Sequence, residues 1–290
     1  MEYFSSNKTD KQIIVFKSIN EMIEFRKSLN QDFKIGFVPT MGYLHQGHLS
    51  LVKKAKSEND FVIVSIFVNP RQFGPGEDFE QYPRDLERDL SLLLACDVDC
   101  VFNPHHLEMY PDNYKTFIEV SDYSNIYCGA SRPGHFKGVA TIVNKLVNIT
   151  RPNNMYMGEK DFQQVVVLKT MLKDLNIDTE IVSCPIIRET DGLAMSSRNI
   201  YLSQNERKYA LCLSHSLYTS KELVKSNVSD LKLFKDKIFE IIKSSFGIID
   251  YVAFIDNDTF TPVSEVNSNT RILLAVKIGN TRLIDNMLMS

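Results

Sequence analysis

The first two thirds of the chain alternate segments that predict strands with segments that predict helices, and this alternation restricts the possible folds most. Strands separated by helices favour an α/β fold with a doubly wound parallel sheet, in which ligands bind at the carboxyl ends of the strands. The predicted strands are 34–38, 61–68, 98–102, 154–157 and 178–184, and the predicted helices are 48–58, 82–94, 139–149 and 162–175.

The pattern changes after Pro185. Ser203, with Glu206 three residues later, predicts a capped helix that runs to about Lys225. A second helix over 231–246 and two strands over 248–255 and 271–278 follow. These segments predict a smaller α+β C-terminal domain. We place the boundary near 185–188, which gives domains of 1–186 and 187–290, packed together because no Gly/Ser linker separates them.

Composition and charge exclude several classes of protein. The 290 residues carry a net charge of −3, with acids and bases mixed along the chain. The sequence lacks a basic stripe, which argues against a nucleic-acid partner. Residues 1–12 are polar and do not resemble a signal peptide, and the longest apolar run, 61–68, is too short to span a membrane. Five cysteines without a C-x-x-C pair favour reduced thiols. We therefore expect a cytoplasmic enzyme.

Two histidines, His45 and His48, lie where the strand 34–38 leads through a glycine-containing turn into a helix. A helix N-terminus offers free N–H groups and positive dipole, so two imidazoles there suit a phosphate. His48 also shares a helical face with Leu51 and Val52, which leaves a role in the core open. Two ligands are too few for zinc. A Walker phosphate loop is excluded because His48 and Leu49 occupy its Lys and Ser/Thr positions.

Four further polar groups have ordinary structural explanations when each is taken alone, but together with the histidines they indicate a site. They are Asn69 and Gln72 after a buried strand, Asp85 and Asp89 one turn apart, Lys160 and Gln164 one turn apart, and Ser196, Ser197 and Arg198 together. Amides can orient a substrate, and paired acids can face a magnesium ion. Lysine, hydroxyl and guanidinium groups can bind phosphate oxygens.

These residues resemble a known family. His45-Gln46-Gly47-His48 is similar to the HIGH-type signature of the nucleotidyltransferase superfamily, and Met195-Ser196-Ser197-Arg198 is similar to its KMSKS loop. The fuller set resembles the pantothenate synthetase (pantoate–β-alanine ligase) family. It comprises, in order, segments 39–48, 66–74, 82–84, 132–136, 158–164, 191–199 and 282–286.

The resemblance implies a reaction that converts pantoate, β-alanine and ATP into pantothenate, AMP and pyrophosphate through a pantoyl adenylate. It implies His45, His48, Lys160 and Arg198 as catalytic residues, with His45 and His48 on the phosphates. It implies three ATP-binding segments: the first with Met41, Gly47 and His48, the second with Gly158, Glu159, Lys160 and Asp161, and the third with Met195, Ser196, Ser197 and Arg198. It also implies that the Ile187 backbone touches the nucleotide. It implies that Pro39, Met41, Asn69, Gln72 and Gln164 bind pantoate and β-alanine.

The resemblance also implies a Rossmann-like first domain, a C-terminal lid, a homodimer and Mg²⁺. Many family members have two adjacent acids where this chain has Arg88 and Asp89, so Asp89 is the remaining metal candidate, with Asp85 as a possible helper. Three alternatives stay open: another nucleotidyltransferase, a fragment of an aminoacyl-tRNA synthetase, and an inactive nucleotide-binding protein. The absence of a basic surface run argues against the synthetase fragment, and intact His45, His48, Lys160 and Arg198 argue against an inactive protein.

Overall fold

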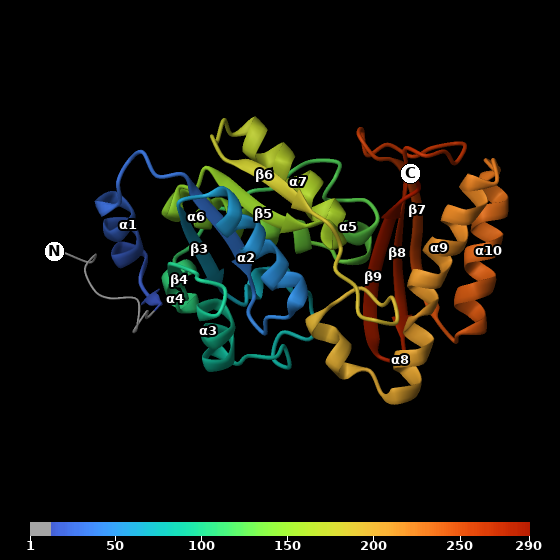
Figure 1. Cartoon of the computed structure of the whole chain (residues 1–290), viewed down its shortest axis with the longest axis horizontal. Coiled ribbons are helices and arrows are strands. Elements are labelled where there is room, and N and C mark those ends of the chain that lie inside the picture. The colour runs from blue at the N-terminus through green and yellow to red at the C-terminus, as the bar shows by residue number, and fades with distance from the viewer. Residues whose placement is uncertain (1–12) are drawn as a thin grey trace.

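Two sheets, each with its own helices, lie side by side along one elongated molecule (Figure 1). The computed structural model describes residues 13–290, so the prediction made for residues 1–12 lies outside the described part. The strands are β1 (Ile14–Phe16), β2 (Ile35–Thr40), β3 (Phe61–Ile66), β4 (Cys100–Phe102), β5 (Asn154–Gly158), β6 (Glu180–Cys184), β7 (Ile248–Asp256), β8 (Thr270–Ile278) and β9 (Thr281–Leu288).

Helices connect the strands of the first sheet and cover one face of the second. The α-helices are α1 (Ile19–Ser28), α2 (Gln46–Glu58), α3 (Leu86–Leu94), α4 (His106–Met109), α5 (Cys128–Ser131), α6 (His135–Thr150), α7 (Phe162–Asp174), α8 (Gln204–Ala210), α9 (Cys212–Lys225) and α10 (Leu231–Ser244). Three short 3₁₀ turns are η1 (Pro70–Gln72), η2 (Glu159–Asp161) and η3 (Ser197–Tyr201). No helix within 13–290 is long and apolar enough to cross a membrane.

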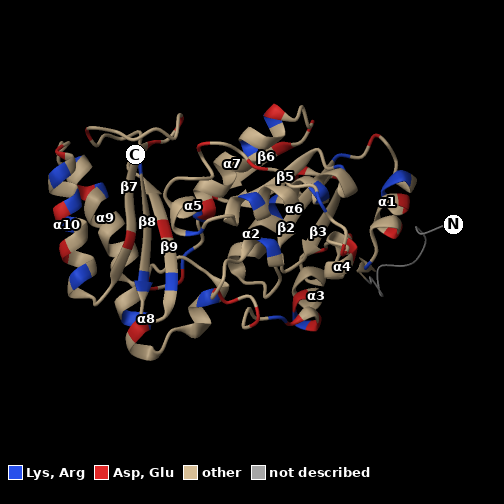
Figure 2. Cartoon of the chain, turned by 180° about the vertical axis from the view of Figure 1, so that it is seen from behind, with Lys and Arg blue, Asp and Glu red and all other residues tan. Residues whose placement is uncertain are grey.

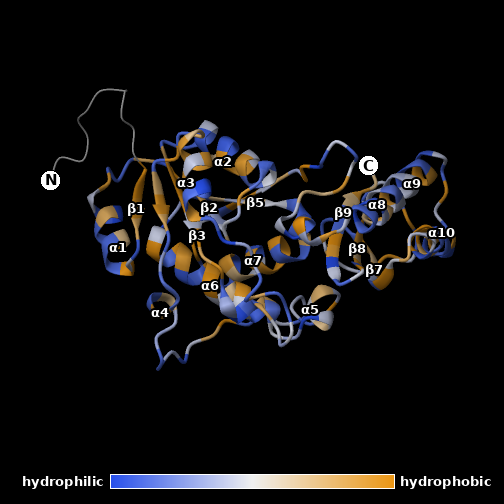
Figure 3. Ribbon diagram, turned by 90° about the horizontal axis from the view of Figure 1, so that it is seen from below, coloured by the Kyte–Doolittle hydropathy of each residue, from blue (hydrophilic) through white to orange (hydrophobic). Residues whose placement is uncertain are grey.

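The first sheet has helices on both faces because its central strands bury both sets of side chains. On β3, Phe61 and Ile63 join one core with α1, α6 and α7, while Val62 and Val64 join the other with α2 and α3. Such two-sided burial is typical of parallel sheets. Figure 3 shows hydrophobic strands such as β1 and β3 among helices that carry both colours.

The order of the strands creates a crevice at one place in the first sheet. The order is β1-β4-β3-β2-β5-β6, with every pair parallel. From β2 the chain continues through β3 to β4 on one side, and from β5 it continues to β6 on the other side. Ligands of doubly wound sheets bind at such a switch point, outside the carboxyl ends of the strands. Here those ends are Thr40 and Gly158. The predicted α/β class is confirmed.

The second sheet is antiparallel, in the order β7-β8-β9. One face packs against α8, α9 and α10 in a separate core. On the other face, Phe260 and Ile255 pack against aromatic residues of the first part, including Tyr123, Tyr127 and Phe162. Both faces are therefore covered, and the second sheet is held against the first part of the chain.

Several predicted boundaries were wrong, for local reasons. The predicted helix 82–94 begins only at Leu86, because the Asp85 side chain caps it by accepting from the backbone N–H of Arg88. The predicted helix 203–225 is interrupted at Leu211 between α8 and α9. The strand predictions omitted β1 and β9, and the helix predictions omitted α1. The division at 186/187 stays an interpretation.

Candidate active site

A cavity of about 230 Å³ lies at the switch point. Its walls come from the ends of β2 and β5, the start of α2, η1, α6 and the segment 185–198. Nearly all the predicted site residues line it: Pro39, Met41, His45, Gly47, His48, Asn69, Gln72, Gly158, Lys160, Asp161, Gln164, Ile187, Met195, Ser196, Ser197 and Arg198. Only Glu159 and Asp89 do not. A larger cavity of about 1110 Å³ shares part of this lining and extends toward the second sheet.

The two histidine rings lie against one another, tilted by 32°, at the N-terminus of α2. His45 is the residue before the helix, and its Nδ1 accepts from the backbone N–H of Gly47 at 3.1 Å. The Nδ1 of His48 accepts from the backbone N–H of His45 at 3.3 Å, and the ring centroids are 4.0 Å apart. A neutral imidazole whose Nδ1 accepts carries its proton on Nε2. Neither Nε2–H has a hydrogen-bond partner within 13–290, so both can donate to a ligand.

Burial keeps both rings neutral. It lowers the pKa of His45 from 6.5 to about 4, and the positive charge of Lys160 acts in the same direction. Burial also lowers the pKa of His48 well below its ordinary value, with His45 and Lys160 adding to the effect. Because the two imidazoles are neutral, they do not repel each other or the Lys160 ammonium before a ligand binds, and all three groups can donate to a polyanion.

Asp89 anchors the turn before the histidines. Its carboxylate is 1% exposed and accepts from the backbone N–H groups of Tyr43 and Leu44, each at 2.7 Å. Arg88 donates to the Leu44 carbonyl at 2.9 Å and lies over the Tyr43 ring. This geometry does not support the predicted magnesium site at Asp89. Nor does any group of three or more His, Cys, Asp or Glu side chains within 13–290 suit a metal ion.

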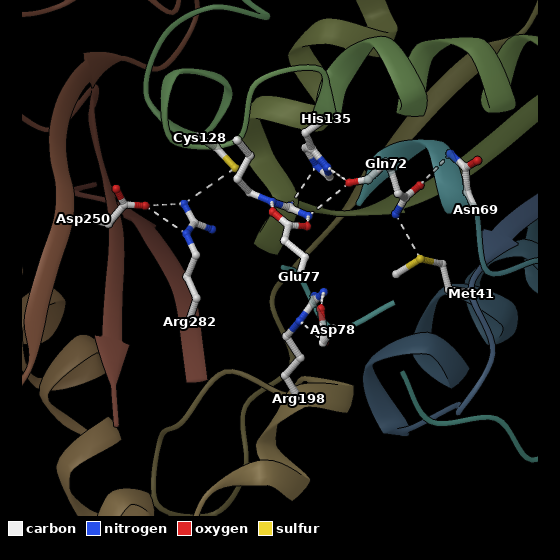
Figure 4. A network of polar contacts seen from close by, with 11 residues as sticks. Met41, Asn69, Gln72, Glu77, Asp78, Cys128, His135, Arg198, Asp250 and Arg282 are labelled. Carbon is white, nitrogen blue, oxygen red and sulfur yellow. Dashed lines mark hydrogen bonds and ion pairs between the residues drawn. The ribbon is translucent and has the colours of Figure 1, made fainter. Parts of the chain in front are cut away.

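Asn69 and Gln72 lie together at the opposite wall. Asn69 is buried and donates to the Gln72 side-chain oxygen at 3.1 Å, and the Gln72 amide donates to the Met41 sulfur at 3.0 Å (Figure 4). The predicted substrate-binding amides are therefore in contact with one another. Gln164 lines the same cavity from α7.

Arg132 and His135 also line the cavity and were missing from the predicted site, although the family resemblance included their segment. His135 Nδ1 and an Arg132 N–H both donate to the Gln72 backbone carbonyl, at 2.8 and 3.2 Å. Arg132 also contacts His135 Nε2 at 3.2 Å and forms a two-bond ion pair with Glu77. Burial, with Arg132 second, lowers the pKa of His135 to about 4, so this ring too is neutral.

The turn after β5 is held from the second sheet. Asn286 on β9 donates to the backbone carbonyls of Glu159 and Lys160 at 2.8 and 3.0 Å. The Glu159 carboxylate accepts from buried Arg271 on β8, which stacks over Phe162 with its guanidinium carbon 4.0 Å from the ring centroid. Glu159 therefore points out of the cavity. The Lys160 ammonium lines the cavity and has no hydrogen-bond or ion-pair partner within 13–290.

Arg198 forms an ion pair with an acidic residue from the first part of the chain. Its guanidinium forms a two-bond ion pair with Asp78, at 2.9 and 2.7 Å (Figure 4). Ser197 donates to the Tyr43 carbonyl at 3.3 Å, so the segment 195–198 touches the turn that carries the histidines. Elsewhere between the two parts, Arg282 on β9 pairs with Asp250 and reaches the Cys128 sulfur at 3.8 Å. All five cysteines are free.

These features are typical of nucleotide-binding enzymes of the doubly wound α/β class, in which a helix N-terminus at the switch point suits a phosphate. The comparisons with known proteins are more specific. The model of the pantoate–β-alanine ligase family matches residues 14–288. The chain belongs to this family and is an ATP-dependent ligase of pantoate and β-alanine.

Individual relatives extend over nearly the whole chain. The pantothenate synthetase of Caldicellulosiruptor saccharolyticus is 54% identical over 279 residues, covering 95% of this chain and 99% of its own. The crystal structure of the Thermus thermophilus pantothenate synthetase is 42% identical with a TM-score of 0.91, covering 96% and 99% of the two chains. The Francisella tularensis ligase, solved with beta-gamma ATP and β-alanine, is 43% identical with a TM-score of 0.82, covering 96% and 98%.

Proposed function

We propose that the chain forms pantothenate in two steps at the switch-point cavity. In the first step, a pantoate carboxylate oxygen attacks the α-phosphorus of ATP, the bond from that phosphorus to the bridging oxygen breaks, and pyrophosphate leaves. In the second step, the β-alanine amine attacks the acyl carbon and loses a proton, the bond to the phosphate oxygen breaks, and AMP leaves. The adenylate makes this substitution possible because a free carboxylate has no comparable leaving group.

One observation carries this proposal: neutral His45 and His48 face one cavity at a helix N-terminus together with Lys160, which has no ion-pair partner in the described part of the chain. The first step increases negative charge on the phosphate chain, and prearranged donors and cations stabilise such charge best. We assign the two Nε2–H groups and Lys160 to the phosphates. Arg198 joins them when it exchanges Asp78 for phosphate oxygens.

The nucleotide and the acid occupy different walls in this proposal. Three segments around Met41–His48, Gly158–Asp161 and Met195–Arg198 hold ATP, with the Ile187 backbone beside it. The Gln72 and Gln164 amides hold pantoate, beside Pro39, Met41 and Asn69. β-Alanine then enters next to Gln72. The Francisella tularensis ligase in complex with ATP and β-alanine supports binding of the same two molecules here.

Magnesium enters the proposal only with ATP. Within 13–290 no group of three or more His, Cys, Asp or Glu side chains suits a metal ion, and Mg²⁺ commonly keeps several waters and binds through substrate phosphates. We assign no step to the ion. The predictions of a homodimer, a cytoplasmic location and no nucleic-acid partner rest on the resemblance and on composition. Sedimentation equilibrium tests the dimer.

Pyrophosphate exchange tests the two-step route. Labelled pyrophosphate should enter ATP when pantoate is present and β-alanine is absent, and no exchange should occur without pantoate. Exchange that requires β-alanine would rule out a separate adenylation step. Exchange with other carboxylic acids but not with pantoate would replace the substrate assignment.

A further inference from the structure

Tyr110 lies outside the central cavity but is bonded to its wall. It follows α4, its side chain is 6% exposed, and its hydroxyl donates to the Asn69 side-chain oxygen at 3.0 Å. Tyr110 does not line either cavity and belongs to none of the predicted ATP or substrate segments. Its contact with Asn69 nevertheless connects it to Gln72, which binds the acid substrate in the proposed function.

The Asn69 amide is fixed by partners on both of its ends. Its oxygen accepts from Tyr110 and from the Arg71 backbone N–H at 3.3 Å, while its nitrogen donates to the Gly138 carbonyl at 3.1 Å. Turning the amide over would place its NH₂ group against the Arg71 backbone N–H and its oxygen against the Gly138 carbonyl. These two backbone partners set the orientation, and the Tyr110 hydroxyl completes the hydrogen bonds that hold this buried amide in place, where unpaired groups are costly.

That orientation continues to Gln72. The second N–H of Asn69 donates to the Gln72 side-chain oxygen at 3.1 Å, so the Gln72 NH₂ group must point away from Asn69. It lies beside Met41 Sδ, at the cavity wall. Gln72 thus presents donors to the cavity, as a carboxylate or hydroxyl oxygen requires. The reversed amide would present an oxygen and repel a carboxylate.

The Tyr110 ring is itself held firmly. It packs edge-on against Tyr114 with centroids 5.1 Å apart, and the Arg71 and Lys145 side chains lie over it. Lys145 also donates to the Met109 carbonyl. Burial raises the pKa of the Tyr110 hydroxyl, so this group keeps its proton and remains a donor at neutral pH.

We propose that Tyr110 is a positioning residue for binding of the acid substrate: its hydroxyl fixes the Asn69 amide, which orients the Gln72 amide with its donors toward the cavity. The inference rests on the proposed function, in which Gln72 binds pantoate. In this proposal Tyr110 contributes to the specificity of the site for the acid substrate although it contacts neither substrate.

Tyr110→Phe removes the hydroxyl and keeps the ring. We expect the KM for pantoate to rise about fivefold, which corresponds to about 1 kcal/mol, while the KM for ATP and the thermal midpoint change little. Tyr114→Phe is the matched control, since no partner of the Tyr114 hydroxyl occurs within 13–290. An unchanged KM for pantoate, or equal increases for pantoate and ATP, would overturn the proposal.

A double-mutant cycle separates a relay through Gln72 from general loosening. In the Gln72→Ala background, the added Tyr110→Phe substitution should no longer change the KM for pantoate. A further fivefold increase there would show that Tyr110 acts by another route and would reject the relay.

Nuclear magnetic resonance of protein with ¹⁵N-labelled glutamine tests the relay without any substrate. The Gln72 side-chain NH₂ signals should shift in Tyr110→Phe and stay in place in Tyr114→Phe; no shift in Tyr110→Phe would reject the relay even if the KM changed. This result does not depend on the reaction. If wild-type protein failed to exchange pyrophosphate with pantoate while the Gln72 signals shifted as expected, the substrate assignment would fail and the orientation of Gln72 would stand.

Discussion

Lys160 is the one cation lining the central cavity that lacks a carboxylate partner in the described part of the chain, whereas Arg132 and Arg198 are both paired. We therefore expect Lys160→Ala to lower kcat by about 100-fold or more, the usual effect of losing one prearranged donor to a growing charge. Steady-state AMP release measures this. Lys169→Ala, at an exposed position on α7, should stay close to wild type. Full activity in Lys160→Ala would remove Lys160 from the mechanism.

The three neutral histidines give the protein a stability that depends on pH. Unfolded histidines bind protons near pH 6.5, but folded His45 and His135 bind them only near pH 4, and burial also lowers the pKa of His48 well below its ordinary value. Between pH 6.5 and 4 the unfolded state therefore holds more protons, so the free energy of unfolding should fall as the pH falls. Urea midpoints across this range measure the slope.

His135→Asn removes one of these groups and should make that slope shallower by up to one proton. His215→Asn, at an exposed position on α9, should leave the slope unchanged. Equal slopes in wild type and His135→Asn would contradict a buried, neutral His135.

At the scale of elements, α3 holds the turn between β2 and α2 through Asp89. Asp89→Asn turns one oxygen into an NH₂ group that faces a backbone N–H, so the free energy of unfolding should fall by about 1–3 kcal/mol. The Mg²⁺ concentration for half-maximal activity should not change. Glu87→Gln, at an exposed position in the first turn of the same helix, is the control. A large rise in the Mg²⁺ requirement would restore Asp89 as a metal ligand.

Sequence periodicity predicted the elements with simple patterns and missed those with mixed ones. The buried run in β3 and the apolar face of α2 are unambiguous. β9 combines buried Leu283 with buried Asp285 and Asn286, whose partners lie on distant segments, so its sequence resembles a polar loop. The same limit applies to Asp89, since spacing reveals neither its burial nor its backbone partners.

The sequence predicted most of the residues that line the cavity, but not the ion pairs that two of its arginines form. The resemblance identified residues that the fold brings to one cavity. The fold does so because β2 and β5 are neighbours in the sheet, although more than a hundred residues separate their ends. The resemblance did not reveal that Glu77 and Asp78 pair with Arg132 and Arg198. Acidic and basic side chains are interspersed along the ribbon (Figure 2), so only the folded geometry selects these partners.

At the scale of the whole molecule, the pair Arg198–Asp78 joins the segment before α8 to the loop after η1. ATP must displace Asp78 from Arg198 if the guanidinium is to bind phosphate. Asp78→Asn should therefore lower the KM for ATP by about fivefold, since a partly buried pair contributes about 1 kcal/mol. Initial rates at saturating pantoate measure this, and Glu80→Gln on the same loop is the control. An unchanged or higher KM for ATP would mean that Asp78 does not compete with the nucleotide.

The bonds from Asn286 to the Glu159 and Lys160 carbonyls have a consequence for biosynthesis. Asn286 follows Lys160 by 126 positions, so a growing chain exposes the turn after β5 long before its partner has been made. Parts of a protein that are synthesised first tend to fold first. The parallel sheet can form on the ribosome, but the turn that we assign to ATP acquires its final hydrogen bonds only once β9 has been translated. Competence to bind nucleotide should therefore arise late in translation, even though nearly every residue that lines the cavity is made early.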